Sequence, residues 1–228
     1  MTTAKIPTDD RVWSGIDYQP AIRAHLPEAL IPFLAEGSRI LDVGCNTGIV
    51  VRFLTEKGME VEGVDLNPAA IATAQQQATQ TVKDGYPRFH LADFLNFTSN
   101  RTFDAIVMIR FLTCVPESDR WQACLDRAAG LLSSDGLLYI HDFAHDPNSL
   151  AYGPRYAEGQ GLGWREGNFP VRRPDGTLQF IAHHHTEADL VSIRSRFDII
   201  THTSHPSTSM NGNPCLMFEC IGRNHRNT

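Results

Sequence analysis

The sequence predicts an α/β domain built on a doubly wound, mostly parallel seven-stranded sheet. Short apolar segments typical of buried strands alternate with helical segments over residues 38–143, which is typical of parallel strands joined by crossover helices. Two further strand-like segments lie at residues 198–204 and 215–223. The length of 228 residues suits one domain of this class, so we expect residues 1–228 to form a single domain.

The elements of residues 38–143 are indicated one by one by their own patterns. Five largely apolar runs predict strands at residues 39–44, 60–65, 88–94, 103–111 and 137–143. Helical spacing predicts helices at residues 48–58, 67–82 and 117–132. Gly58 is placed to end the first helix, while Asn67 and Pro68 are placed as the N-cap and first residue of the second.

The segments outside this core carry different signals. Residues 1–37 are expected to form a helical cap that is interrupted by prolines. Residues 144–185 are rich in glycine, proline and aromatic residues and too long for a plain connection, so we expect a lid or substrate insertion with a hairpin around "PDG". Residues 186–228 are expected to supply a closing helix and two strands, with Thr186 and Asp189 spaced as a capping box.

Composition and charge exclude several classes of protein. The net charge is −6 and basic residues form no dense stripe, which disfavours a nucleic-acid partner and favours a small molecule. No apolar run approaches the roughly 18 residues of a membrane span, and the N-terminus lacks the apolar core of a signal peptide. The 5 cysteines form no CxxC pair and fit buried free thiols in a reducing compartment. We expect a cytoplasmic protein with no membrane partner; its oligomeric state cannot be read from the sequence.

The segment Ile40–Gly48, "ILDVGCNTG", carries the strongest functional signal. A buried strand passes into a turn with Gly44, Cys45, Asn46 and Gly48, and a helix begins directly afterwards. Glycines let the backbone turn sharply and let a ligand approach closely. The free N–H groups of the helix N-terminus can bind a polar ligand. Asn46 stands where many such loops have a third glycine, and asparagine is the side chain that best tolerates a positive φ.

Two acidic residues follow at the ends of the next two predicted strands. Asp65 comes 21 positions after Gly44 and is placed to accept hydrogen bonds from ribose hydroxyls. Asp93 and Phe94 end the third strand, where an acid can hold an exocyclic amine and an aromatic ring can pack on a purine. Because open α/β sheets bind ligands at the carboxyl ends of their strands, we expect these residues to share one site.

Taken in order, these motifs resemble those of class I S-adenosylmethionine-dependent methyltransferases. "LDVGCNTG", "GVDLNP", "ADF", "FDAIVMIRFLTCVPE" and "LLSSDGLLYIHDF" carry the resemblance, which covers residues 38–143. It implies a Rossmann-like fold with an antiparallel last strand and S-adenosyl-L-methionine as cofactor.

In this chain the resemblance implies that Gly44 to Gly48 line the methionine part of the cofactor, that Asp65 holds the ribose and that Asp93 holds the adenine amine. It further implies that Leu66 and Phe94 pack on the adenine, with Ile109 and Arg110 near the sulfonium.

The run His183–His185 has three possible roles. Strand geometry puts His183 and His185 on one face and His184 on the other. A packing or capping role with at least one exposed histidine is the first interpretation. The second is that His184 or His185 is a general base, since histidine titrates near neutral pH. The third is a metal site, with His141, Asp142 or His145 completing the ligands. We expect no metal, because methyl transfer from a sulfonium does not need one.

Arg110 and a set of aromatic and polar residues are the other candidates. Arg110 ends an apolar run, so its charge must face a ligand or an acid such as Asp142. Either Arg110 or Tyr18 is expected to orient the cofactor carboxylate or the substrate. The candidate substrate contacts are Trp13, Asp142, Tyr152, Tyr156 and Asn211. Asn211 belongs to "SMNGNPCLMFECIGR", a segment that resembles the tails of bacterial small-molecule methyltransferases.

The function indicated is methyl transfer to a nucleophilic O, N or S atom of a small molecule. Two alternatives remain at this point. One is an NAD(P)-dependent oxidoreductase on a similar fold, although its usual loop is G-x-G-x-x-G and the second glycine is absent here. The other is a regulatory protein that binds the cofactor without turnover, since a fold alone does not settle function.

Overall fold

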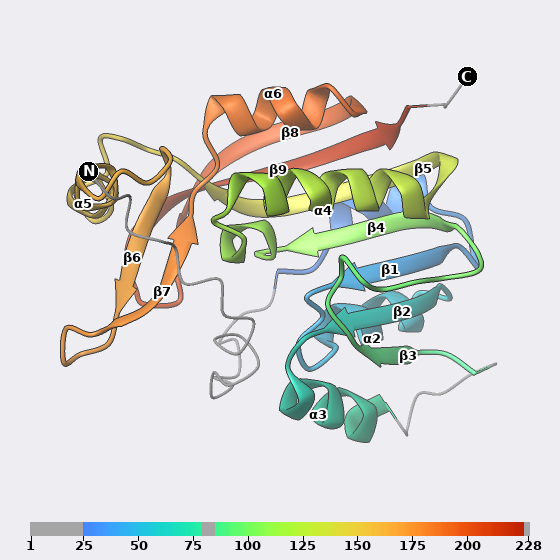
Figure 1. Ribbon diagram of the computed structural model, residues 1–228. Coiled ribbons are helices and arrows are strands. Elements are labelled where there is room, and N and C mark those ends of the chain that lie inside the picture. Colours follow the sequence, from blue (N-terminus) through green and yellow to red (C-terminus); the bar gives the residue numbers. More distant parts are fainter. Residues whose placement is uncertain (1–24, 79–84, 226–228) are drawn as a thin grey trace.

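The computed structural model describes residues 25–78 and 85–225 and shows a seven-stranded sheet with helices on both faces (Figure 1). The strand order is β3-β2-β1-β4-β5-β9-β8. β1 pairs parallel with β2 and β4, β2 with β3, and β4 with β5, whereas β9 pairs antiparallel with both β5 and β8. The predicted doubly wound fold with an antiparallel end is therefore confirmed.

The strands of this sheet are β1 (Arg39–Val43), β2 (Glu60–Asp65), β3 (Arg88–Leu91), β4 (Phe103–Ile109), β5 (Leu132–Ala144), β8 (Phe197–Thr208) and β9 (Pro214–Asn224). The helices are η1 (Glu28–Phe33), α2 (Ile49–Glu56), α3 (Pro68–Ala78), η2 (Leu112–Cys114), α4 (Ser118–Leu131), α5 (Gly153–Gly161) and α6 (Glu187–Arg194). β3 and β4 end earlier than predicted, so Asp93, Phe94 and Arg110 lie in the turns that follow the strands.

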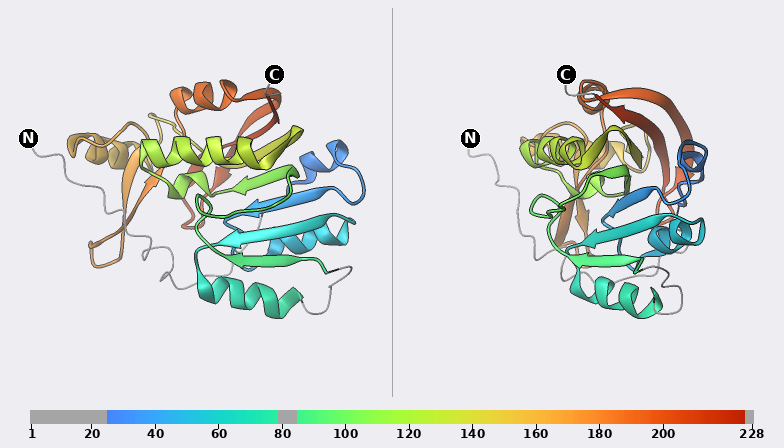
Figure 2. Two further views of the ribbon diagram at one scale, coloured as in Figure 1. Left: turned by 45° about the vertical axis from the view of Figure 1, so that its right-hand side comes forward. Right: turned by 90° about the vertical axis from the view of Figure 1, so that its right-hand side faces the viewer.

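Two apolar layers hold the helices to the sheet. Every residue of β1 is buried, as expected for a central parallel strand covered on both faces. One layer joins the sheet to α4 and α6 through Trp121, Leu125 and Ile193. The other joins it to η1, α2 and α3 through residues such as Leu30, Leu54 and Ile71. The helices on the two faces are separated clearly in the side views (Figure 2).

Two predicted helix starts are confirmed by their hydrogen bonds. The side chain of Asn67 accepts hydrogen bonds from the backbone N–H groups of Ala69 and Ala70 at the start of α3. Thr186 and Asp189 form a reciprocal capping box at the start of α6. The polar side chains therefore fix where these helices begin, as the sequence indicated.

The predicted hairpin in residues 144–185 is present as β6 (Asn168–Arg172) and β7 (Leu178–His183), which pair antiparallel. α5, which the sequence did not indicate, packs against β6. An added Cβ on Gly159 of α5 would lie 2.3 Å from the carbonyl oxygen of Asn168, so the glycine permits this close approach. The hairpin lies beyond the carboxyl ends of β1, β2 and β4 (Figure 1).

No helix of the described residues is long and apolar enough to cross a membrane. The five cysteines are free in the structure, as predicted, and three of them are buried.

The predicted N-terminal cap falls only partly within the described residues, where η1 is a single 3-10 helix. Residues 1–24 lie outside the described residues, and so do the candidates Trp13 and Tyr18.

Candidate active site

The loop between β1 and α2 depends on its two glycines. Gly44 has φ of 71° and Gly48 has φ of 73°, a region that L side chains rarely adopt. A Cβ on Gly48 would lie 2.6 Å from the Phe89 ring, and one on Gly44 would lie 3.0 Å from the Phe111 ring. Asn46 is exposed and has φ of 48°, which confirms that asparagine adopts the left-handed conformation here.

Asp65 braces this loop from the end of β2. One carboxylate oxygen accepts a hydrogen bond of 2.9 Å from the backbone N–H of Asn46, and the other accepts one of 2.8 Å from the N–H of Asn67. The side chain of Cys45 is buried against Gly63 of β2, so Cys45 can offer only its backbone to a ligand. Asp65 and Leu66 are only half-buried, which leaves both accessible at the edge where the strands end.

Asp93 and Phe94 follow β3 at the same edge. Asp93 accepts a hydrogen bond from the backbone N–H of Leu95 and forms an ion pair of 2.6 Å with Arg120. Phe94 is 3% exposed and contacts the Phe111 ring edge-on, with 5.9 Å between the ring centroids. The structure thus places Phe94 in the core, and the prediction that it packs on adenine lacks the exposed surface that it requires.

Asp42 is an acidic residue of β1 that the sequence did not single out as functional. Its carboxyl is 2% exposed, and one oxygen has no hydrogen-bond partner. Burial, reinforced by the nearby charge of Asp65, raises the pKa of Asp42 to about 8. Its position in the middle of an apolar strand, two residues before Gly44, was the signal that could have revealed it.

Arg110 is held in an unusual backbone conformation directly after β4. It has φ of 53°, and its N–H donates to the carbonyl of His141 at 2.9 Å. Its Nε is buried without a hydrogen-bond partner, and the guanidinium lies 6.0 Å from the centroid of the Phe143 ring. No acid among residues 25–78 and 85–225 forms an ion pair with Arg110, so the proposed pairing with Asp142 is wrong.

Three histidines gather near Arg110 on one face of the sheet. His25 stacks on His141 with ring centroids 3.5 Å apart, and His205 also stacks on His141, with ring centroids 5.6 Å apart. Burial, together with the charges of His25 and Arg110, lowers the pKa of His141 to about 3. Both ring nitrogens of His141 are buried without a hydrogen-bond partner.

A carboxylate and a phenol complete this group. Nε2 of His25 lies 2.6 Å from the Tyr139 hydroxyl and 3.2 Å from Glu219, and the Tyr139 hydroxyl also donates to Glu219 at 2.7 Å. Burial, opposed by Glu219, lowers the pKa of His25. Sequence reasoning did not single out His25, His205 or Glu219, because they come from three separate segments and carry no motif.

The three consecutive histidines are all buried, with exposed fractions of 0%, 3% and 2%. The expectation that at least one is exposed is therefore wrong. His184 stacks on Phe143 at 4.8 Å, and its Nδ1 lies 2.6 Å from the Tyr156 hydroxyl. His185 contacts the Trp121 and Phe218 rings on the other face. Neither His184 nor His185 reaches the surface, so this structure does not support the prediction of a general base there.

The other predicted substrate contacts fall into two groups. Tyr152 and Tyr156 are buried in an aromatic cluster with Phe169. Asp142 is fully buried and accepts hydrogen bonds from the backbone N–H groups of Thr113 and Phe143. These three side chains therefore support the hairpin and sheet and do not face a substrate. Asn211 is exposed in the turn between β8 and β9, at the edge where β5 ends.

The sheet order, the glycine loop and the acid after β2 together define a nucleotide-type cofactor site at the carboxyl edge of an α/β sheet. The methyltransferase domain family matches residues 16–198. The chain thus belongs to the S-adenosylmethionine-dependent methyltransferase family, as the sequence motifs indicated.

Two solved methyltransferase structures are similar to this chain. A solved structure of a SAM-dependent methyltransferase from Methanosarcina mazei has a TM-score of 0.79 and 29% identity, and the match covers 92% of this chain and 99% of that one. An N-methyltransferase of Bradyrhizobium japonicum, solved with S-adenosyl-L-homocysteine, has a TM-score of 0.56 at 18% identity and covers 82% of this chain and 78% of that one, which shows the shared fold.

A curated relative, the ubiquinone biosynthesis O-methyltransferase of Alkalilimnicola ehrlichii, is 28% identical over 118 residues. The match covers 51% of this chain and 46% of that protein, so the chain spans about half the length of this relative.

Proposed function

We propose that the protein transfers a methyl group from S-adenosyl-L-methionine to a nucleophilic O, N or S atom of a small molecule. The observation that carries this proposal is the loop Gly44–Gly48, in which two left-handed glycines turn the chain from β1 into α2 and Asp65 accepts a hydrogen bond from the backbone N–H of Asn46. The residues present fit this cofactor. When bound, it supplies an electrophilic methyl group on a sulfonium.

The cofactor contacts follow from the positions at the carboxyl edge. The backbone of Gly44, Cys45, Asn46 and Gly48 would hold the methionine part, and Asp65 would accept hydrogen bonds from the ribose. Leu66 would pack on the adenine, and Asp93 would bind its amine while Arg120 holds the carboxylate in place. Ile109 ends β4 and Arg110 follows it, between this site and the histidine group, where the reacting atoms would meet.

The acceptor side is the group around Arg110. A half-buried arginine whose buried Nε has no hydrogen-bond partner, and which pairs with no acid among the described residues, favours an acceptor with a negatively charged or strongly electron-rich group. His25 is the side chain best placed to remove a proton, because Glu219 and Tyr139 hold its Nε2 and so leave Nδ1 with the free lone pair. Asn211 lies in the turn at the same edge and is a further candidate contact.

The rate should come mainly from alignment of the nucleophile with the methyl group and from exclusion of water by the segment 144–185. The named relatives act on different atoms, since one is an O-methyltransferase and another an N-methyltransferase. A dinucleotide-dependent oxidoreductase is not favoured, because Asn46 with its side chain stands where that loop needs a second glycine.

A pair of matched variants tests the cofactor site. Asp65→Ala should weaken binding of S-adenosylhomocysteine by roughly 1.5–3 kcal/mol, since it removes a charged hydrogen-bond acceptor. Asp198→Ala is the control, because Asp198 is exposed near the opposite end of the sheet. Equal affinities of both variants, measured by calorimetry with the wild type beside them, would remove Asp65 from the site. Asp93→Ala should weaken binding in the same direction.

A further inference from the structure

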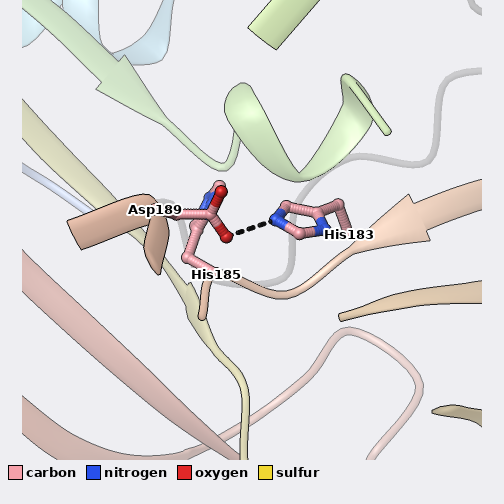
Figure 3. Close-up of side chains that lie close together, drawn as sticks. All are labelled: His183, His185 and Asp189. Atoms are coloured by element: carbon pink, nitrogen blue, oxygen red, sulfur yellow. Dashed lines mark hydrogen bonds and ion pairs between the residues drawn. The ribbon is translucent and has the colours of Figure 1, made fainter. Parts of the chain in front are cut away.

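A second group of chemically reactive side chains lies on the opposite face of β5 from His141. His183 at the end of β7, His185 two residues later and Asp189 in the first turn of α6 approach one another (Figure 3). One ligand atom of each lies within 4.8 Å of the others, and all three residues are buried. Methyl transfer does not use this group, because none of the three side chains reaches the carboxyl-edge surface.

The hydrogen bonds of His183 determine which nitrogen carries its proton. Nδ1 lies 2.8 Å from Oδ1 of Asn168. The orientation of that amide is fixed, because its nitrogen donates to the carbonyl of Pro116 at 3.1 Å. Nδ1 of His183 therefore donates to an oxygen that only accepts, and a neutral ring keeps its lone pair on Nε2.

This lone pair points at a second acceptor. Nε2 of His183 lies 2.9 Å from Oδ2 of Asp189, as the dashed line in Figure 3 shows. Asp189 also receives the N–H and hydroxyl of Thr186, so its carboxylate is in the charged, accepting form. Two acceptors cannot remain this close unless a cation lies between them or beside them. That cation is either a proton on Nε2 or a metal ion.

His185 also has a carboxylate near one of its ring nitrogens. Its side chain is fully buried, and neither ring nitrogen has a hydrogen-bond partner. Nε2 lies 3.3 Å from Oδ2 of Asp142, a distance at which this carboxylate can orient the ring. With Nε2 turned to Asp142, Nδ1 is the nitrogen with a free lone pair. Histidine ligands of metals are usually held in this way, with the second nitrogen on a carboxylate or carbonyl oxygen.

The net charge of the side chains around this group also favours a bound cation. Asp142 and Asp189 bring two carboxylates into a buried region, and Arg165, 3.4 Å from Asp189, is the single described Lys or Arg that pairs with either of them. With both rings neutral, one negative charge stays uncompensated. A divalent ion bound to the free lone pairs of both rings would compensate this charge.

We propose that His183, His185 and Asp189 bind one zinc ion, with Asn168 and Asp142 as the residues that orient the two imidazoles. Two imidazoles and one carboxylate suit zinc better than the oxygen-preferring ions calcium and magnesium. The ion would join the end of the hairpin to the N-terminus of α6 and so hold the segment 144–185 against the sheet. The site is structural, and its presence would revise the expectation that the protein binds no metal.

Elemental analysis of untagged protein, purified without chelators, tests this site. We expect about one zinc per chain and a lower melting temperature after dialysis against a chelator, restored by one equivalent of zinc. His185→Gln and Asp189→Asn should abolish the stoichiometric zinc, whereas His202→Gln and His225→Gln, which change exposed histidines, should keep it.

The wild type alone keeps the proposal falsifiable if a variant does not fold. Folded wild-type protein with no bound zinc, and with no rise in melting temperature on adding zinc to the dialysed protein, would overturn it. A proton on His183 would then fill the position between the ring and Asp189. Zinc that persists in both His185→Gln and Asp189→Asn would also overturn it, because such zinc lies elsewhere on the surface.

Discussion

Replacing Gly48 with alanine tests whether the loop geometry is as tight as the structure shows. The added Cβ would lie 2.6 Å and 2.7 Å from two carbons of the Phe89 ring and 3.3 Å from the Cβ of Ala74. An L side chain at a left-handed φ costs about 1–2 kcal/mol, and overpacking against the Phe89 ring costs about 1–3 kcal/mol more. The sum predicts a destabilisation of roughly 2–5 kcal/mol.

The matched control is Gly176→Ala in the turn between β6 and β7. Gly176 has a similar φ of 84°, but no atom lies within 4 Å of its Cβ position. It therefore carries the backbone cost alone, about 1–2 kcal/mol. Urea denaturation gives both stabilities, and calorimetry with S-adenosylhomocysteine gives the affinities. Only the Gly48 variant should lose affinity, and equal destabilisation of the two variants with unchanged affinity would refute the reasoning.

Three further outcomes follow from other side chains of the site. The raised pKa of Asp42, about 8 against an ordinary 3.8, means that the folded state prefers the protonated carboxyl. The protonated Asp42 carboxyl contributes its full stabilisation of the folded state below about pH 4, and this contribution is lost as the pH rises through 8. Asp42→Asn should therefore gain stability relative to the wild type over this range, as measured by urea titrations. Tyr156→Phe removes the partner of His184 Nδ1 and should cost about 1–3 kcal/mol of stability. An unchanged unfolding midpoint would show that this contact contributes nothing. Once an acceptor is known, Arg110→Met should raise its KM at least tenfold, and an unchanged KM would place the acceptor elsewhere.

The core of the fold could be predicted because its signals are local. The apolar runs around Leu41 and Val107, the cap at Asn67 and the capping box of Thr186 and Asp189 each depend on neighbours within a few residues. α5 was missed because its sequence, "GPRYAEGQG", contains three glycines and a proline. It is held by packing against β6 and not by helix propensity.

The candidate site could be predicted only on its cofactor side. Gly44, Asp65 and Asp93 belong to consecutive strand ends and can be read in order along the chain. The group of His25, His205 and Glu219 comes from residues far apart in sequence that meet only after β8 and β9 pair with β5. Burial was misjudged for the same reason, since no local pattern shows that α5 and the hairpin cover His184 and Tyr156.

Calorimetric titration of the purified protein with S-adenosylhomocysteine, beside a dinucleotide control, measures whether the carboxyl edge of the sheet binds the proposed cofactor. We expect S-adenosylhomocysteine to bind with a Kd of order micromolar, about −8 kcal/mol, and the dinucleotide not to bind. A folded protein that binds the dinucleotide, or neither compound, would show that the loop at Gly44–Gly48 does not hold this cofactor.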